Sequence, residues 1–339
     1  MTQPAMPMRR RRFITIAAAA AGLPLLYPGS GPAAATPLQV WTGSALGADA
    51  MLQIQHPDPR TADRLIADSL REVARLERVF SLYQPDSALA RLNLAGRLDD
   101  PPADLLRLLA QSARFSQLTQ GAFDPTVQPL WSVYAAHFSR PDADPGGPPH
   151  AAIGAALQRV GYQHIELSAR HIRFGLPGMA LTLNGIAQGY ITDRVVELLR
   201  NAGMHHALVD MGETRAIGSH PSGGPWRIGL RQPGKGGKIG QRIALQDQAV
   251  ATSGGYGTPL DPAGRFNHIF DPHTGGSSWR YRSVSVIAPD ATTADALSTA
   301  FSLMPLPSVA RIAGMLNLQT WFVLDDGRWV TTRETCCRF

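Results

Sequence analysis

Cysteine is almost absent from this sequence. Its 339 residues include two, Cys336 and Cys337, which stand next to each other near the C-terminus. Adjacent cysteines enclose no loop for a stabilising bridge, so a disulfide framework is excluded. We expect exposed thiols in a frayed terminus, and pairing with another chain is the alternative. Zinc-binding patterns are missing too, because the sequence has neither a cysteine cluster nor H-E-x-x-H.

Clustered positive charge is missing from most of the chain. The formal net charge is +6, but Arg9, Arg10, Arg11 and Arg12 supply four of these charges, and the remainder holds 28 basic and 26 acidic residues. A nucleic-acid-binding face needs Lys and Arg gathered on one surface, so this composition argues against nucleic-acid binding. Hydrophobic residues make up 44% and charged residues 17%, which predicts a folded globular protein.

No apolar run reaches the ~20 residues that span a bilayer. The candidate run, residues 13–27, follows the four arginines, is interrupted by glycine and proline, and precedes Ala33-Ala34-Ala35. This order is typical of a cleaved signal peptide over residues 1–35, and the arginine pair before an alanine-rich segment favours the twin-arginine pathway. We expect a periplasmic protein without a membrane span in the mature chain. An uncleaved anchor is the alternative.

Common catalytic signatures are absent as well. The sequence has no G-x-x-x-x-G-K-[ST] and no G-x-G-x-x-G between a strand and a helix, which excludes the two common nucleotide cradles. It has no G-x-S-x-G, which excludes the usual serine-hydrolase elbow.

Hydrophobic periodicity predicts an α+β fold. Alternation over residues 46–54 predicts a strand, and a 3.6-residue period predicts helices from residue 61 to 80 and over 105–118. The Pro-, Gly- and Asp-rich stretch 139–149 marks an exposed excursion and a candidate internal boundary. Consecutive strands separated by helices favour largely antiparallel sheets with packed helices. Later predictions are a hairpin at 164–174, helices at 186–199, 294–301 and 309–316, and strands at 207–209, 226–230, 242–245, 283–287 and 320–324.

Asp295 and Thr299 are the first candidate site. They stand four residues apart on a predicted helix, so both oxygens lie on one face and can reach one hard cation. Further oxygens and a phosphate would complete a magnesium site. The residues alone also fit a helix start that Asp295 caps or solvates, with Thr299 bonded back to its own turn.

His268 is the second candidate. It lies three residues before Asp271, and a histidine near an aspartate is suited to general-base chemistry near neutral pH. The same stretch also reads as a well-formed turn. Small-residue loops at 121–126 and 252–256 each stand beside an aromatic residue and suit a phosphate or a flat ring.

Six short segments, taken together in their order along the chain, indicate a protein family more specifically than any one of them does. The chain from about residue 43 to 325 resembles the ApbE family of FAD:protein FMN transferases, and its leader and residues 181–190 (LTLNGIAQGY) are similar to the NosX-like branch associated with nitrous-oxide respiration. The segments are FSLYQPDS (80–87), GAFDPT (121–126), GIAQGY (185–190), ATSGGY (251–256), HIFDPHTG (268–275) and DALST (295–299).

The resemblance implies an ApbE-like, T-fold-like domain over residues 36–339 and a Mg²⁺-dependent transfer of FMN from FAD to a threonine hydroxyl of a partner protein, with release of AMP. By family analogy Asp295 and Thr299 hold the metal, and the Gly185 carbonyl and Ser298 add oxygens. His268 is predicted to be the catalytic base. Predicted FAD contacts are Leu46, Tyr83, Ala122, Phe123, Asp124, Thr182, Gln188 and Phe270.

Two positions depart from the family pattern, which usually has aspartate where this chain has Thr182 and lysine where it has Gln188. A neutral pair thus replaces a charged pair, which motivates a second hypothesis, a periplasmic FAD or FMN carrier without transferase activity. A third is an FAD pyrophosphatase, in which water replaces threonine. The NosX-like resemblance implies that the acceptor is an exported or membrane-bound flavoprotein similar to NosR.

Overall fold

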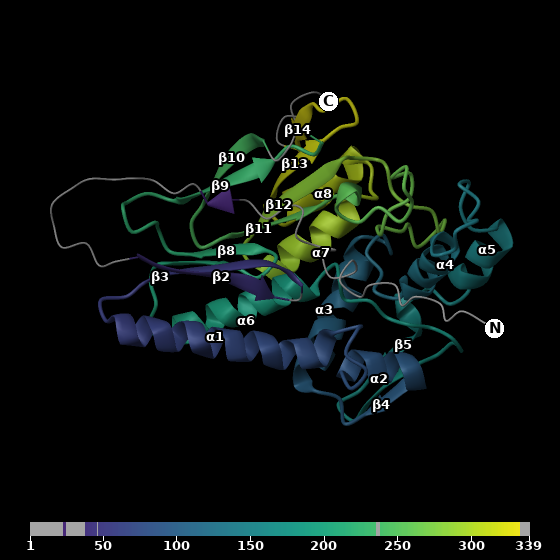
Figure 1. Cartoon of the computed structure of the whole chain (residues 1–339), viewed down its shortest axis with the longest axis horizontal. Helices are drawn as coiled ribbons and strands as arrows, with labels where there is room; N and C mark the ends of the chain where they lie inside the picture. Colours follow the sequence, from purple (N-terminus) through teal and green to yellow (C-terminus); the bar gives the residue numbers. More distant parts are fainter. Residues whose placement is uncertain (1–22, 25–37, 46, 235–237, 333–339) are drawn as a thin grey trace, which may run out of the picture.

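A computed structural model describes residues 23–24, 38–45, 47–234 and 238–332. Leu46, the cysteine pair and the predicted leader apart from residues 23–24 lie outside these described residues. An eight-stranded antiparallel sheet forms the centre of the molecule (Figure 1). Its order is β14 (Trp329–Thr331), β13 (Gln319–Val323), β12 (Ser283–Ala288), β11 (Ala249–Ser253), β8 (Thr214–Ile217), β7 (Ala207–Asp210), β3 (Ala48–Gln55) and β2 (Leu38–Ala45).

The two faces of this sheet are covered differently. Helices α1 (Pro59–Phe80), α6 (Ala187–Asn201) and α7 (Ala291–Phe301) pack on one face, and α7 contacts β11 and β12 (Figure 1). On the other face a second core joins Leu208 and Val250 to Trp226 and Ile228 of a smaller sheet. That smaller sheet has the order β1 (Leu23–Pro24), β9 (Trp226–Arg231) and β10 (Ile239–Leu245).

The remaining elements extend the helical side. Helix α8 (Leu306–Met315) buries Val309 and Ile312 in the main core. Helices α2 (Ala88–Ala95), α3 (Ala103–Leu118), α4 (Gln128–Phe138) and α5 (His150–Leu157) lie on the side of Figure 1 where a third sheet is found. Its strands are β4 (Arg97–Asp99), β6 (His171–Phe174) and β5 (Ile165–Leu167), and short 3₁₀ turns lie at Tyr162–His164 and Gly255–Gly257.

Helix α1 shows how the sequence starts and orients an element. Asp58 caps it by accepting hydrogen bonds from the Arg60 and Thr61 N–H groups, at 3.2 and 3.1 Å. Pro59 fits the first turn because a backbone N–H at that position would have no acceptor within the helix. Leu65, Val73 and other apolar residues at helical spacing are buried against the sheet. The predicted amphipathic helix is therefore confirmed, and it begins two residues earlier than predicted.

The remaining predicted helices and the predicted hairpin agree with the structure. The helices expected at 105–118, 186–199, 294–301 and 309–316 correspond to α3, α6, α7 and α8, and the expected hairpin is the β5–β6 pair. The mixed α+β class with antiparallel sheets is confirmed. The excursion at 139–149 connects α4 and α5, whose small core contains Leu130, Tyr134 and Phe270. None of the described helices is both long and apolar enough to cross a bilayer.

Candidate functional site

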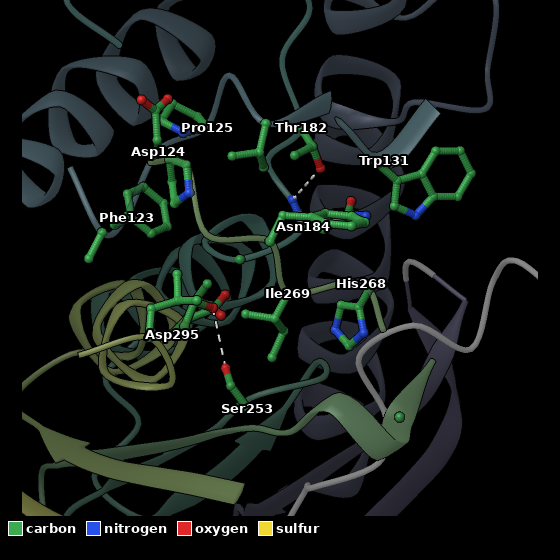
Figure 2. Close-up of a pocket in the computed structure, with 18 of the residues that line it drawn as sticks. Phe123, Asp124, Pro125, Trp131, Thr182, Asn184, Ser253, His268, Ile269 and Asp295 are labelled. Atoms are coloured by element: carbon green, nitrogen blue, oxygen red, sulfur yellow. Dashed lines mark hydrogen bonds between the residues drawn. The ribbon is translucent and has the colours of Figure 1, made fainter. Parts of the chain in front are cut away.

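One cavity brings together segments that are far apart in the sequence (Figure 2). Its walls come from the loop that enters α4, the turn before α6, the end of β11, the segment around His268, and α7. Most of the predicted site residues meet here. They are Ala122, Phe123, Asp124, Thr182, Gly185, His268, Phe270, Asp295 and Thr299.

Four predicted residues are not among those that line the cavity. Tyr83 lies between α1 and α2, is 52% exposed and does not line the cavity, and Leu46 is outside the described residues. Ser298 is buried, and its hydroxyl bonds to the Asp295 carbonyl and to Ser253 Oγ. Gln188 is buried behind the wall, where its Oε1 has no hydrogen-bond partner among the described residues. Their proposed contacts with FAD or metal stay predictions.

Asp295 is held by α6 and is not a helix cap. Asp290 caps α7 by accepting from the Thr293 N–H, whereas Asp295 lies one turn further on and is 3% exposed. Asp295 Oδ2 accepts a hydrogen bond from the Gly189 N–H at 2.9 Å. A side chain at Gly189 would collide with the Ala291 carbonyl oxygen at 2.3 Å, so glycine is what allows α6 this close to α7.

Thr299 and Gly185 continue the same oxygen-lined wall. A Cβ atom on Gly185 would lie 2.9 Å from Thr299 Oγ1, so the bare backbone lets the hydroxyl approach the turn before α6. Thr299 Oγ1 lies 3.2 Å from Ser253 Oγ, at the end of β11. The alternative in which Thr299 bonds back to its own turn is not what the structure has.

The donor atoms of this wall suit a hard cation. Asp295 and Thr299 supply carboxylate and hydroxyl oxygens beside the Gly185 backbone, and the described residues hold no group of three His, Cys, Asp or Glu side chains suited to a metal. Magnesium is usually bound by one or two carboxylates, with water and substrate phosphates as its other ligands. The residues present therefore fit Mg²⁺ with oxygen ligands better than a transition metal with nitrogen or sulfur ligands.

The loop at 121–126 is tied to the turn before α6. Asp124 Oδ1 accepts from the Thr126 N–H at 2.8 Å and from its hydroxyl at 2.6 Å, and Oδ2 accepts from the Tyr162 N–H at 3.0 Å. The Thr182 N–H donates to the Pro125 carbonyl at 2.8 Å. The Asp124 carboxylate thus shapes this wall of the cavity, because one oxygen is bonded within the loop and the other accepts from the Tyr162 N–H.

His268 lines the cavity (Figure 2). Burial lowers its pKa to about 4, although a hydrogen bond with the Thr258 backbone acts to raise it. Its Nδ1 is buried and has no hydrogen-bond partner in the described part of the chain.

Several cavity residues were not identified from the sequence, among them Trp131, Asn184 and Glu213. Trp131 comes from α4, Asn184 from the turn before α6, and Glu213 from the β7–β8 turn. Trp131 and Asn184 stand in no catalytic pattern, and Glu213 follows Asp210-Met-Gly in what reads as an ordinary turn. Glu213 enters the wall because antiparallel pairing places β8 beside β11.

Burial also shifts the cavity carboxylates. It raises the pKa of Asp295 to about 7, the Gly189 N–H acts against this, and the negative charge of Asp193 adds to it. Burial likewise raises the pKa of Glu213 well above its usual range, and the charges of Asp295 and Asp210 add to the effect. Two buried acids near each other favour a cation or a proton at this wall.

Comparisons of sequence place the chain among flavin-transferring proteins. The model of the ApbE family matches residues 46–322. The chain is 31% identical to the FAD:protein FMN transferase of Haemophilus influenzae, over 75% of this chain and 77% of that protein. It is also 31% identical to the FAD:protein FMN transferase of Treponema pallidum, over 75% and 78% of the two chains.

Solved structures give the same result. The ApbE protein of Thermotoga maritima superposes with a TM-score of 0.78 at 29% identity, over 89% of this chain and 99% of that one. The apo flavinyl transferase ApbE of Pseudomonas stutzeri superposes with a TM-score of 0.73 at 27% identity, over 87% and 93%. The family match over residues 46–322 includes every residue that lines the cavity described above.

Proposed function

Because this chain belongs to the ApbE family, we propose that it is an FAD:protein FMN transferase. The observation that carries the proposal is the shared cavity, in which the oxygen wall of Asp295 and Thr299 lies with His268 and the loop at 121–126. These parts supply what phosphoryl transfer needs, namely charge stabilisation, a base and a fixed site for the dinucleotide.

The reaction follows from these residues. His268 Nδ1 takes the proton of the acceptor threonine hydroxyl, and the threonine oxygen forms a bond to the phosphorus on the FMN side of FAD. The bond from this phosphorus to the bridging oxygen breaks, and AMP leaves with the electron pair. Asp295, Thr299 and the Gly185 carbonyl would hold Mg²⁺, which when bound neutralises charge on the diphosphate. Phe123 and Phe270 give the flavin an apolar wall.

Thr182 and Gln188 stand where the family usually has aspartate and lysine, which raises the question whether the protein transfers FMN or only binds the flavin. One assay distinguishes these activities. The purified protein would be mixed with FAD, Mg²⁺ and a threonine-containing acceptor, and flavin fluorescence on the denatured acceptor and AMP release would be measured. Labelled acceptor with equal AMP supports the transferase. FAD retention without AMP would support the carrier, and AMP without labelled acceptor would support the pyrophosphatase.

Export and the partner form a second part of the proposal. The four arginines before the apolar run at 13–27 support transport by the twin-arginine pathway to the periplasm, and the likeness to the NosX-like branch supports an acceptor similar to NosR in nitrous-oxide respiration. Replacement of Arg11 and Arg12 by lysine should keep the protein in the cytoplasm in cell fractionation. An unchanged periplasmic fraction would contradict this route.

A further inference from the structure

Glu213 stands on a turn whose backbone is fixed from two sides. Asp210 uses both carboxylate oxygens inside the turn, because Oδ1 accepts from the Gly212 N–H and Oδ2 from the Thr214 hydroxyl, each at 3.1 Å. From α6, the Thr192 hydroxyl donates to the Glu213 carbonyl at 3.0 Å. The backbone of Glu213 is thus anchored, while its side chain lines the cavity and the residue is 5% exposed.

The first two turns of α6 join this turn to α7. On one side the Gly189 N–H bonds to Asp295, as described above. On the other side Gln188 packs on Gly212, where a Cβ atom would lie 2.4 Å from Gln188 Nε2 and where φ is +102°. Glycine at position 212 is required by both the backbone angle and the lack of space. Helix α6 therefore sets Glu213 and Asp295 in one cavity wall.

The two carboxylates have few partners of their own. Within the described ranges neither forms an ion pair, and the α6 side chain that packs on Gly212 beside Glu213 is the neutral amide of Gln188. Glu213 accepts a hydrogen bond from the Thr252 backbone, and Asp295 accepts one from Gly189. The bond from Gly189 reaches only Oδ2 of Asp295, and this residue is 3% exposed and lines the cavity. A nearly buried carboxylate that faces a cavity with one N–H donor points to a ligand.

We infer that Glu213 supplies a second carboxylate to the divalent cation that Asp295 holds. The charge of the cation offsets the repulsion between the two buried acids. Neutral hydrogen-bond donors offset this repulsion only weakly. This inference deepens the proposed function and rests on its cation. It also adds a side chain from the β7–β8 turn, far from α7 in the sequence, to the protein oxygens proposed for this cation.

Metal binding without turnover tests the inference. Mn²⁺ would be titrated into the full-length protein, with and without ADP as a diphosphate, and free Mn²⁺ followed by electron paramagnetic resonance. We expect Glu213→Gln to raise the dissociation constant at least tenfold and Asp295→Asn to raise it further. Glu166→Gln, which removes an exposed carboxylate paired with Arg173 on β6, is the matched control and should bind as the wild type does.

The melting temperature supplies a second readout. If Glu213 had a purely structural role, its replacement would not change the melting temperature in the way described next. Without metal, Glu213→Gln should melt at the same temperature as the wild type or higher, because the substitution removes a buried repulsion. With saturating Mn²⁺ the wild type should gain more than the variant, since ligand binding to the native state raises stability. Equal Mn²⁺ affinity in wild type and Glu213→Gln, or a variant that melts lower in metal-free buffer, overturns the inference.

The same experiment separates this inference from the proposed function. If Mn²⁺ binding depends on Glu213 but no acceptor is labelled, the ligand assignment stands and the transferase proposal fails. If the acceptor is labelled while Glu213→Gln binds Mn²⁺ normally, the ligand assignment fails alone. A wild type that takes up no Mn²⁺ in either buffer refutes the inference, because it requires a cation at this wall.

Discussion

Asp193 on α6 and Asp295 on α7 lie on neighbouring helices, yet their carboxylates are satisfied in different ways. Asp193 accepts hydrogen bonds from the Ala291 and Thr292 N–H groups, both at 2.8 Å, and from the Thr292 hydroxyl at 2.6 Å, and it pairs with Arg215. Asp295 accepts one N–H bond, from Gly189. A buried carboxylate with every oxygen occupied fixes the start of a helix, and one with an open oxygen remains available to a ligand.

The largest expected effect is the loss of transfer in Asp295→Asn. The rate of AMP release should fall roughly thousandfold, because charge stabilisation by a bound metal contributes several kcal/mol to the transition state. Stability should hold or rise, since an uncharged amide is cheaper to bury than an unpaired carboxylate. Asp142→Asn, at an exposed position, is the control. An unfolded Asp295→Asn protein would show that this carboxylate is structural as well.

Asp193→Asn should behave in the opposite manner. It leaves the buried guanidinium of Arg215 without its charge partner, and breaking such a pair costs about 3 kcal/mol of unfolding free energy. Urea denaturation measures this loss. The variant that remains folded should still transfer FMN at a near-normal rate. A catalytic defect without a loss of stability would erase the distinction between the two carboxylates.

His268→Gln should lower the transfer rate by about a hundredfold, a typical share for a general base. FAD binding should change little, because glutamine keeps most of the buried volume. Flavin fluorescence quenching reports binding, and labelled acceptor reports transfer. If His268 merely shapes the cavity, the two readouts should fall together. His273→Gln, at an exposed position of the same segment, is the control.

The smallest expected effect is the loss at low pH of the stability that Arg75 contributes through Glu72 and Asp104. Hydrogen bonds and ion pairs with Arg75 hold the pKa of Glu72 below its usual value, and those with Tyr190 and Arg75 overcome burial to lower the pKa of Asp104 as well. This stability is complete above the unfolded pKa of about 4 and is lost as the pH falls through the lower folded values. Arg75→Gln should remove about 1 kcal/mol at pH 7, because the partly exposed pair is screened by solvent.

A urea series from pH 7 to pH 3 checks this last prediction. The difference between wild type and Arg75→Gln should shrink toward the acid end, where Glu72 and Asp104 are protonated and the arginine has lost its partners. A difference that stays constant with pH would show that Arg75 stabilises α1 through packing alone.

Regular elements could be predicted wherever a period extends over several turns. Helix α1 spans 22 residues with one buried face, and every residue of β12 is buried. The short helices α4 and α5 were not predicted. In α5 the pattern is weak, because its eight residues (HAAIGAAL) include a single buried side chain, Ala156. Trp131 was therefore missed along with the helix that carries it.

The site residues also differ in whether a local sequence pattern could predict them. Asp295 and Thr299 were predicted because a spacing of four residues on a helix already places two oxygens on one face. Glu213 was not predicted, since its sequence neighbours describe only a turn. Its link to the site depends on the contacts of α6 with Gly212 and with α7, which no local pattern encodes.

By itself, the sequence determined the local order of the chain, namely where helices begin, which faces are apolar, and which oxygen donors share a helix face, because these follow from backbone geometry over a few residues. Only the tertiary structure decided which buried acids are left open. The donors that satisfy Asp193 stand 98 and 99 residues away from it, and the donor to Asp295 stands 106 residues away. Such distant pairs form when helices pack on a common sheet, so only packing separates a structural carboxylate from one that can bind a ligand.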